Sequence, residues 1–165
     1  MGIMGISNIK ATAGMILGDL PYPLLYNTIG NETLFYVNFA YNLLNYFEFT
    51  SDRYAELRYR HSFEGIILNT IPLLKRLKWR LIGEANVLYG DLSQESIDRV
   101  VYPTDINGDP IMPFSQFTNK PYIELGYGVE NILRILTVRA FHRLTYLDQN
   151  NVNKFAIKLN IELNL

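Results

Sequence analysis

Polar and apolar residues alternate from Lys154 to Leu165, and this pattern constrains the fold more than any other feature of the sequence. Successive side chains on a β-strand project to opposite faces, so a period of two gives a strand one apolar face and one polar face. All the residues between the apolar positions are polar except Ala156. The segment therefore predicts a strand that runs to the last residue. Its apolar face would consist of Phe155, Ile157, Leu159, Ile161, Leu163 and Leu165.

The same alternation recurs upstream and predicts an all-β chain of about seven antiparallel strands. These strands are long for a soluble sheet, in which about 5–6 residues are usual. Their length suits a tilted strand that crosses a bilayer, which takes about 9–11 residues. The expected strands are Leu136–Tyr146, Tyr122–Asn131, Trp79–Asp91 and Arg53–Leu68, with weaker ones at about Phe39–Phe49 and about Ile6–Leu17.

Length and composition narrow the classes of protein further. A chain of 165 residues fits one domain, so we expect a single all-β unit over residues 1–165. The net charge of -1 argues against a nucleic-acid partner, and the absence of Cys excludes disulfides and Cys-based zinc sites. No apolar run is long enough for a transmembrane helix. Met1–Gly14 does not read as a secretory signal, which fits either a cytoplasmic protein or the end of a longer chain whose signal lies upstream.

Charged residues gather on the polar faces of neighbouring expected strands. Opposite charges recur from one strand to the next, as expected where side chains pair inside a narrow polar lumen. The pattern favours a transmembrane β-barrel segment. A soluble sandwich or lipocalin-like barrel with a solvated outer face is the alternative. The expected lumen-facing residues are Glu56, Arg58, Arg60, Glu64, Arg80, Glu84, Glu124, Glu130, Arg139 and Arg143.

Aromatic residues lie near the ends of several expected strands, where outer-membrane barrels carry interfacial aromatics. Soluble sheets are also rich in Tyr at strand ends, so this signal only supports the membrane interpretation. The expected interface aromatics are Trp79, Tyr89, Tyr146 and Phe155, together with Tyr54. A basic cluster of Lys75, Arg76, Lys78 and Arg80 beside Trp79 fits either anionic headgroups or a solvated turn.

No pattern of residues predicts catalysis or a metal site. His61 and His142 lack metal-binding spacing, and adjacent His61 and Ser62 would point to opposite faces of a strand. Glu56 and Glu64 would lie about 27 Å apart along one strand, too far for paired acid–base chemistry. Asp105–Pro110 resembles part of a calcium loop, but Pro110 and Gln116 occupy the positions that need Gly and an acid. We therefore expect a polar turn there, no cofactor and no enzyme activity, with a cation site as the weaker alternative.

The sequence contains, in this order, the motifs Gly18–Leu25, Gly30–Thr33, Asn42–Phe49, Ile71–Trp79, Lys120–Glu124, Gly128–Ile132 and Arg143–Leu147. Together they resemble the C-terminal barrel region of a Bacteroidota outer-membrane family of unknown function. Members of that family carry an N-terminal carboxypeptidase-regulatory-like domain before a large barrel. The chain differs in ending on Leu165, where outer-membrane strands often end in Phe, and in placing His142 at an outward position.

This resemblance implies an architecture and a location, and it brings no catalytic residues. Seven strands cannot close a bacterial barrel, so we expect about the last third of a larger, up-and-down antiparallel barrel in the bacterial outer membrane. The expected partners are outer-membrane lipid and further strands upstream of Met1. Such a segment would be structural or transport-related. The alternative remains a soluble antiparallel barrel or sandwich that binds a small apolar ligand.

A periplasmic C-terminus would fix the side on which each connection lies. Leu92–Pro121 and Leu147–Asn153 would then be cell-surface loops. Asn69–Lys78 and Asn131–Ile135 would be periplasmic turns. The same count places Asp19–Phe35 on the periplasmic side, where so long a connection is unexpected.

Overall fold

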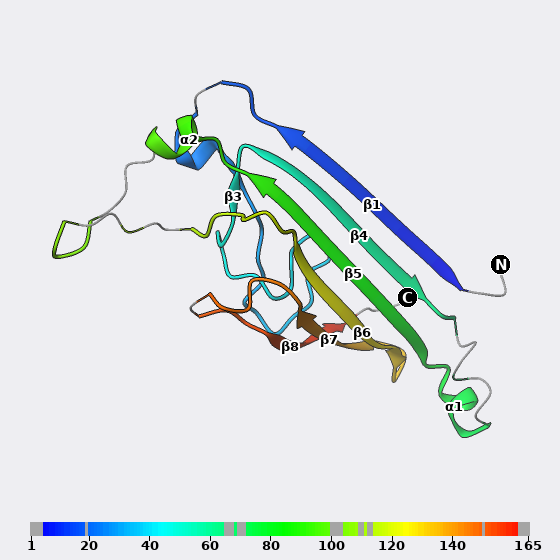
Figure 1. Ribbon diagram of the computed structural model, residues 1–165. Helices are drawn as coiled ribbons and strands as arrows, with labels where there is room; N and C mark the ends of the chain where they lie inside the picture. The colour runs from blue at the N-terminus through cyan, green and yellow to red at the C-terminus, as the bar shows by residue number, and fades with distance from the viewer. Residues whose placement is uncertain are drawn as a thin grey trace.

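One antiparallel sheet dominates the computed structural model, which describes residues 5–18, 20–64, 68, 72–99, 104–108, 111, 114–149 and 151–161 (Figure 1). Its six strands are paired in the order β1-β4-β5-β6-β7-β8. The all-β prediction is confirmed, and the sheet is open in the described residues, with β1 and β8 at its two edges. The strands are β1 (Ile6–Met15), β4 (Arg53–Ser62), β5 (Arg80–Asp91), β6 (Tyr122–Ile132), β7 (Leu136–Arg143) and β8 (Phe155–Ile161).

The remaining elements are short and lie in the connections. A 3-10 helix η1 (Tyr22–Leu24) precedes β2 (Tyr26–Asn27), which pairs with β3 (Thr50–Ser51). Helix α1 (Pro72–Leu77) lies between β4 and β5, and α2 (Gln94–Arg99) follows β5. Among the described residues, no helix has the length and apolarity needed to span a membrane.

The strand expected at about Phe39–Phe49 is wrong. These residues belong to a long irregular connection between β1 and β4, and β1 pairs directly with β4. The backbone N–H groups of Asn42 and Leu43 donate to the Glu124 carboxylate instead of to a neighbouring strand. Phe47 has a φ of 57°, a left-handed conformation that a regular strand excludes. We call residues 20–51 the inner segment.

Because Phe39–Phe49 is not a strand, the connection that contains Asp19–Phe35 lies at the other end of the sheet from the one expected. The connection from β1 to β4 lies at the same end of the sheet as the connections that follow β5 and β7, which we call the loop end (Figure 1). The opposite end, the turn end, carries the connection through α1 and the tight turn between β6 and β7. Asp19 itself lies outside the described residues.

Several strands are shorter than expected. β4 ends at Ser62, and Glu64 lies beyond it with a φ of 46°. β7 ends at Arg143, so Leu144–Tyr146 fall outside the sheet. The expected strand extensions over residues 65–67 and 162–165 lie outside the described residues, as do parts of the expected Leu92–Pro121 loop and Asn69–Lys78 turn.

The two faces of the sheet differ in chemistry and in what covers them. The sheet curves around the inner segment, which lies against the polar inner face (Figure 1). The apolar outer face carries exposed side chains, among them Ile9, Leu57, Tyr127 and Ile157. A hydrophobic cluster fills the space between inner segment and sheet near the loop end. It consists of Tyr41, Leu44, Phe49, Leu88, Tyr122 and Tyr146.

Candidate functional site

The candidate site is the polar interface between the inner face of the sheet and the inner segment. Register aligns its charged residues across the strands: Asn86 lies opposite Arg58 on one side and opposite Glu124 on the other, and Glu124 lies opposite Arg143. The expected grouping of charges on one face is therefore present within the sheet. The inner segment covers much of this face, so many of the charged groups are buried rather than exposed to an open lumen.

Glu124 binds the inner segment most directly. Its Oε1 accepts hydrogen bonds from the Asn42 backbone N–H at 3.0 Å and from Asn86 Nδ2 at 2.9 Å. Its Oε2 accepts from the Leu43 backbone N–H at 3.0 Å and from the Tyr122 hydroxyl at 2.9 Å. The Glu124 side chain is fully buried, and a buried carboxylate needs such donors to offset its lost hydration.

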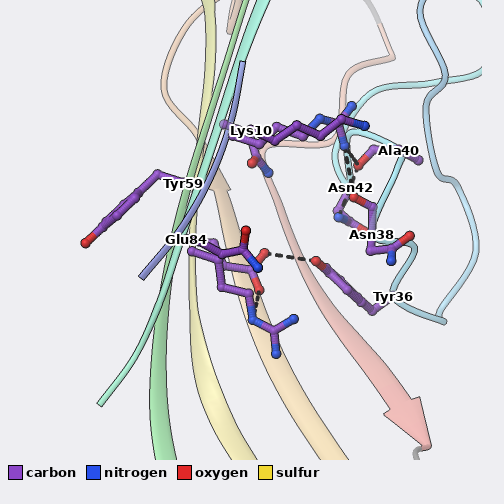
Figure 2. Close-up of a pocket in the computed structure, with 11 residues that line it drawn as sticks. Lys10, Tyr36, Asn38, Ala40, Asn42, Tyr59 and Glu84 are labelled. Atoms are coloured by element: carbon purple, nitrogen blue, oxygen red, sulfur yellow. Dashed lines mark hydrogen bonds and ion pairs between the residues drawn. The ribbon is translucent and has the colours of Figure 1, made fainter. Parts of the chain in front are cut away.

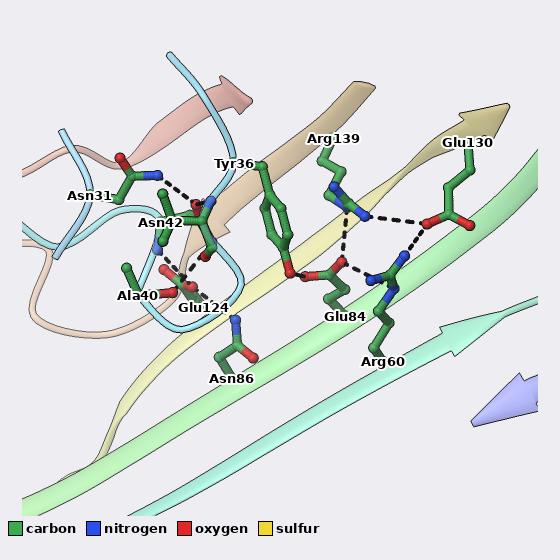
Figure 3. Close-up of polar contacts among 11 residues, drawn as sticks. Asn31, Tyr36, Ala40, Asn42, Arg60, Glu84, Asn86, Glu124, Glu130 and Arg139 are labelled. Atoms are coloured by element: carbon green, nitrogen blue, oxygen red, sulfur yellow. Dashed lines mark hydrogen bonds and ion pairs between the residues drawn. The ribbon is translucent and has the colours of Figure 1, made fainter. Parts of the chain in front are cut away.

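A second cluster joins two cations and two acids closer to the turn end (Figure 3). Arg139 Nε lies 3.0 Å from Glu84 Oε1, and Arg139 Nη2 lies 3.2 Å from Glu130 Oε1. Arg60 pairs with the same Glu130 oxygen and lies 3.8 Å from Glu84 Oε1. Because Arg139 is 1% exposed, these pairs neutralise a charge that burial would otherwise destabilise.

Tyr36 connects this cluster to the inner segment. Its ring lies 3.8 Å from the Arg139 guanidinium carbon, and its hydroxyl donates to Glu84 Oε2 at 3.3 Å (Figure 3). Burial, reinforced by the nearby Glu84 carboxylate, raises the pKa of Tyr36 to about 12. The phenol therefore stays protonated and acts as a donor at neutral pH.

Glycines on β6 leave room for these contacts. A Cβ at Gly128 would lie 2.2 Å from the Val138 carbonyl oxygen and 3.0 Å from Arg139 Cγ. A Cβ at Gly126 would lie 2.5 Å from the Phe141 ring. The alternation of Glu124 with these glycines thus lets side chains of β7 lie across the inner face.

Two further ion contacts were not expected from the sequence. Arg143 Nη2 donates to Glu48 Oε1 at 2.7 Å. The sequence did not predict this pair, because Glu48 was assigned to the expected strand Phe39–Phe49. Lys158 Nζ donates to the carbonyl of Asn31 at 2.8 Å and to that of Thr33. The sequence placed Lys158 on the polar face of the C-terminal strand, and it carried no other sign of these contacts.

Arg58 and Glu56 hold the inner segment on the β1 side. Arg58 Nη1 donates to the carbonyls of Asn38 and Ala40, each at 3.2 Å, and its guanidinium lies over the Tyr41 ring. The Tyr26 hydroxyl donates to Glu56. Burial is the main reason that the pKa values of Tyr26 and Tyr41 lie above their usual value.

Two of the ten expected lumen residues lie apart from these clusters. Glu64 and Arg80 contact each other across 3.5 Å at the turn end. Glu64 lies beyond the end of β4, so its assignment to the strand row is corrected.

The expected interface aromatics separate into two groups. Tyr89 and Phe155 are exposed near the loop end, and Trp79 lies half-buried just before β5. Tyr146 is instead buried in the hydrophobic cluster, where its hydroxyl accepts from the Thr118 backbone N–H at 3.0 Å, so its assignment to a membrane interface is wrong. Tyr54 faces inward and stacks on Tyr26 with ring centroids 3.5 Å apart.

A polar pocket of about 170 Å³ remains beside the inner segment (Figure 2). It lies between the inner segment and the inner faces of β1, β4 and β5. Its charged lining residues are Lys10, Arg58, Arg60 and Glu84, and its amides are Asn8, Asn38, Asn42 and Asn86.

The histidines lie on the outer face, away from this pocket. Ser7 Oγ lies 2.8 Å from His61 Nδ1, a contact between cross-strand neighbours that sequence reasoning about Ser62 missed. His142 Nε2 lies 3.2 Å from the Tyr127 hydroxyl. Asp105 Oδ1 accepts from the Asn107 backbone N–H at 2.8 Å, as in a polar turn, whereas Asp109 and Pro110 lie outside the described residues. In the described part of the chain, no three His, Cys, Asp or Glu side chains are grouped to hold a metal ion.

Comparison with known proteins adds a family. Residues 1–95 match the model described as "Family of unknown function (DUF5686) C-terminal domain", which covers β1, β4, β5 and the whole inner segment. No curated protein and no solved structure matches the chain. Since the match covers more than half of the 165 residues, the chain belongs to this family of unknown function.

Proposed function

We propose that the chain is a non-enzymatic segment of a bacterial outer-membrane β-barrel, structural or transport-related, with a polar, ion-paired lumen. The observation that carries this proposal is the inverted distribution of polarity across one sheet. Charged side chains are buried on the inner face, while large apolar side chains are exposed on the outer face. A lipid-facing barrel wall has this distribution.

The burial of individual residues makes the inversion plain. Arg139, Arg143 and Lys158 are each at most 3% exposed, whereas Ile9 and Tyr127 on the outer face are 67% and 57% exposed. A soluble sheet normally buries its apolar face and exposes its charges. Contact with lipid would explain why the apolar outer face is not covered by another part of the protein.

The two edge strands of the sheet support a larger barrel. An unpaired strand edge in hydrocarbon would leave backbone N–H and C=O groups without hydrogen bonds. β8 is an edge strand whose Leu159 backbone pairs with Leu34 and Tyr36 of the inner segment. β1 forms the other edge in the described sheet. We infer that upstream strands of the same barrel complete the wall.

The inner segment would then lie inside the lumen as a constriction. Glu124, Arg139, Arg143 and Lys158 bind it from three successive strands. A wall with such an insert suits slow or selective passage, or a purely structural role, better than a wide water-filled pore.

Orientation and origin complete the proposal. With a periplasmic turn end, the connections at Leu92–Pro121 and Leu147–Asn153 face the cell surface, and so does the connection that contains the inner segment. Exposed Tyr89, Phe155 and half-buried Trp79 suit the two interfacial aromatic belts. The motif resemblance supports a Bacteroidota source and an upstream carboxypeptidase-regulatory-like domain.

Cell fractionation tests the proposal. An antibody against the Leu92–Pro121 loop should detect the protein in washed outer membranes, in a band much larger than 19.1 kDa. Intact cells should bind the antibody if that loop faces outward. Release into the soluble fraction by salt alone would contradict insertion into the membrane.

The alternative is a soluble antiparallel barrel or sandwich that binds a small apolar ligand. An apolar hollow of about 660 Å³ on the outer face, lined by Leu81, Tyr127, Val129 and Val138 among others, is the observation that favours it. A 19.1 kDa band in the soluble fraction would support this alternative. Binding of a fluorescent apolar probe to that soluble protein would then show that it takes up an apolar ligand.

A further inference from the structure

The polar pocket beside the inner segment carries more donors than the chain uses. Exposed Lys10, Asn8 and Asn38 line it, and within the described residues their side chains make no hydrogen bond or ion pair. Arg58 also lines it, and its buried Nε has no hydrogen-bond partner. Glu56 Oε2 lies 3.8 Å from that nitrogen, too far for a hydrogen bond.

Three cations also share this part of the inner face. Lys10 and Arg58 are direct cross-strand partners on the inner face, and Arg60 is the next inward residue along β4. Like charges directly opposite each other destabilise a sheet unless an anion compensates. Glu56 lies 3.8 Å from Arg58, whereas Lys10 has no ion pair within the described residues. The acids near Arg60 are already engaged: Glu130 pairs with Arg60 and Arg139, and Glu84 lies 3.0 Å from Arg139.

The pocket leaves room for an acceptor that would satisfy these groups. Lys10, Asn38 and Tyr36 border the same space, between β1 and the inner segment (Figure 2). Its volume of about 170 Å³ equals the share of about five or six liquid waters, enough for a small polar group.

We propose that this pocket binds a small oxyanion, the carboxylate or phosphate group of a ligand. Lys10 Nζ supplies the charge, and the side-chain amides of Asn8 and Asn38 supply neutral donors. Arg58 stays in place through its bonds to the Asn38 and Ala40 carbonyls and adds a positive field. Charge-assisted hydrogen bonds of this kind are about twice as strong as neutral ones. The site needs only the sheet and the inner segment, so it goes beyond the proposed membrane function.

Calorimetric titration of the purified full-length protein in detergent tests the site. Sodium phosphate and sodium acetate are titrated separately, with sodium chloride holding the ionic strength constant. At least one anion should bind saturably to the wild type. Tighter binding of phosphate would assign the pocket to phosphate groups, and tighter binding of acetate would assign it to carboxylates.

Variants connect the binding to the pocket. Lys10→Gln should weaken the Kd about tenfold, while Lys10→Arg should keep it within about threefold of the wild type. Lys75→Gln removes an exposed lysine from α1 at the turn end and should leave the Kd unchanged. The Lys10 side chain makes no hydrogen bond or ion pair within the described residues, so equal melting temperatures of the Lys10 variants and the wild type will show an intact fold.

Two results would overturn the inference. The first is the absence of saturable heat with either anion above the chloride background. The second is an equal loss of binding in Lys10→Gln and Lys75→Gln, since this would indicate nonspecific attraction to positive charge. Fractionation into the soluble phase would refute the membrane proposal and leave this binding test unaffected.

Discussion

The Glu124 carboxylate accepts a hydrogen bond at 3.0 Å from the backbone N–H of Asn42, a residue 82 positions earlier in the chain. The same carboxylate binds the next backbone N–H of the inner segment, that of Leu43. A single acidic side chain on the sheet thus takes the place of a neighbouring strand in satisfying these two donors. This contact explains why the inner segment is irregular and yet fixed.

Glu124→Ala should lower the free energy of unfolding by at least about 3 kcal/mol, because it leaves two backbone N–H groups, Asn86 Nδ2 and the Tyr122 hydroxyl without their acceptor. Glu124→Gln should have a smaller effect, since one acceptor oxygen remains. Urea unfolding followed by the fluorescence of the single Trp measures both. Glu95→Ala, an exposed position in α2, serves as control and should change stability by about 0.5 kcal/mol. Equal stability of all three variants would contradict the role of Glu124.

Leu57→Arg distinguishes lipid from water on the outer face. Leu57 lies midway along β4 opposite Ala11 and Val87, and its side chain is 45% exposed. If lipid contacts this face, the substitution should cost about 2–4 kcal/mol in protein reconstituted into vesicles. In water an exposed Arg should change stability by about 0.5 kcal/mol.

Ile106→Arg is the matched control for this measurement, because Ile106 is fully exposed in a connection at the loop end. Its unfolding free energy should match that of the wild type. An equally small effect at Leu57 would argue against the membrane proposal.

Gly128→Ala should destabilise the protein by about 1–3 kcal/mol, since the new Cβ would lie 2.2 Å from a backbone oxygen and force β6 and β7 apart. The displaced Arg139 would also lose its close pairing with Glu84. Gly83→Ala is the control: its nearest atom would lie 3.9 Å away, on the Phe63 ring. Thermal unfolding should therefore separate the two variants, and similar melting temperatures would show that β6 tolerates a side chain at this position.

Asp52 should make stability depend on pH at the loop end. Its Oδ2 accepts from the Ser93 backbone N–H at 2.9 Å and from Ser96 Oγ at 3.1 Å, at the start of α2. Burial opposes ionisation, but these hydrogen bonds outweigh it, and the pKa of Asp52 lies below its usual value. A carboxylate with a lowered folded pKa adds stability above the unfolded pKa of about 3.9, and this contribution is lost as the pH falls through the folded pKa.

The melting temperature of the wild type should thus fall more steeply between about pH 5 and pH 2 than that of Asp52→Asn. At pH 7 the variant should be the less stable of the two. Parallel curves for the two proteins would show that Asp52 does not contribute to the acid sensitivity.

Alternation of polar and apolar residues was sufficient to predict the long strands and the face to which each side chain points. β5 and β6 were predicted to within about two residues, because the alternation is local and register follows from it. The charges of Glu84, Glu124 and Arg139 could be assigned to one face for the same reason. Ser93 was the available signal for α2, because its Oγ accepts from the Ser96 backbone N–H at 3.4 Å and caps the start of the helix.

The cover of the polar inner face could not be predicted from local sequence patterns. Phe39–Phe49 has the apolar content of a strand, but its backbone donors bind Glu124, and nothing local to the segment reveals an acceptor so distant in the sequence. Tyr146 likewise reads as a strand-end aromatic and is buried by residues from β5, β6 and the inner segment. Strand periodicity is a property of neighbouring residues, so the sequence predicted the six long strands and their two faces. The polar interface depends on contacts between segments far apart in the chain, which only the folded arrangement brings together.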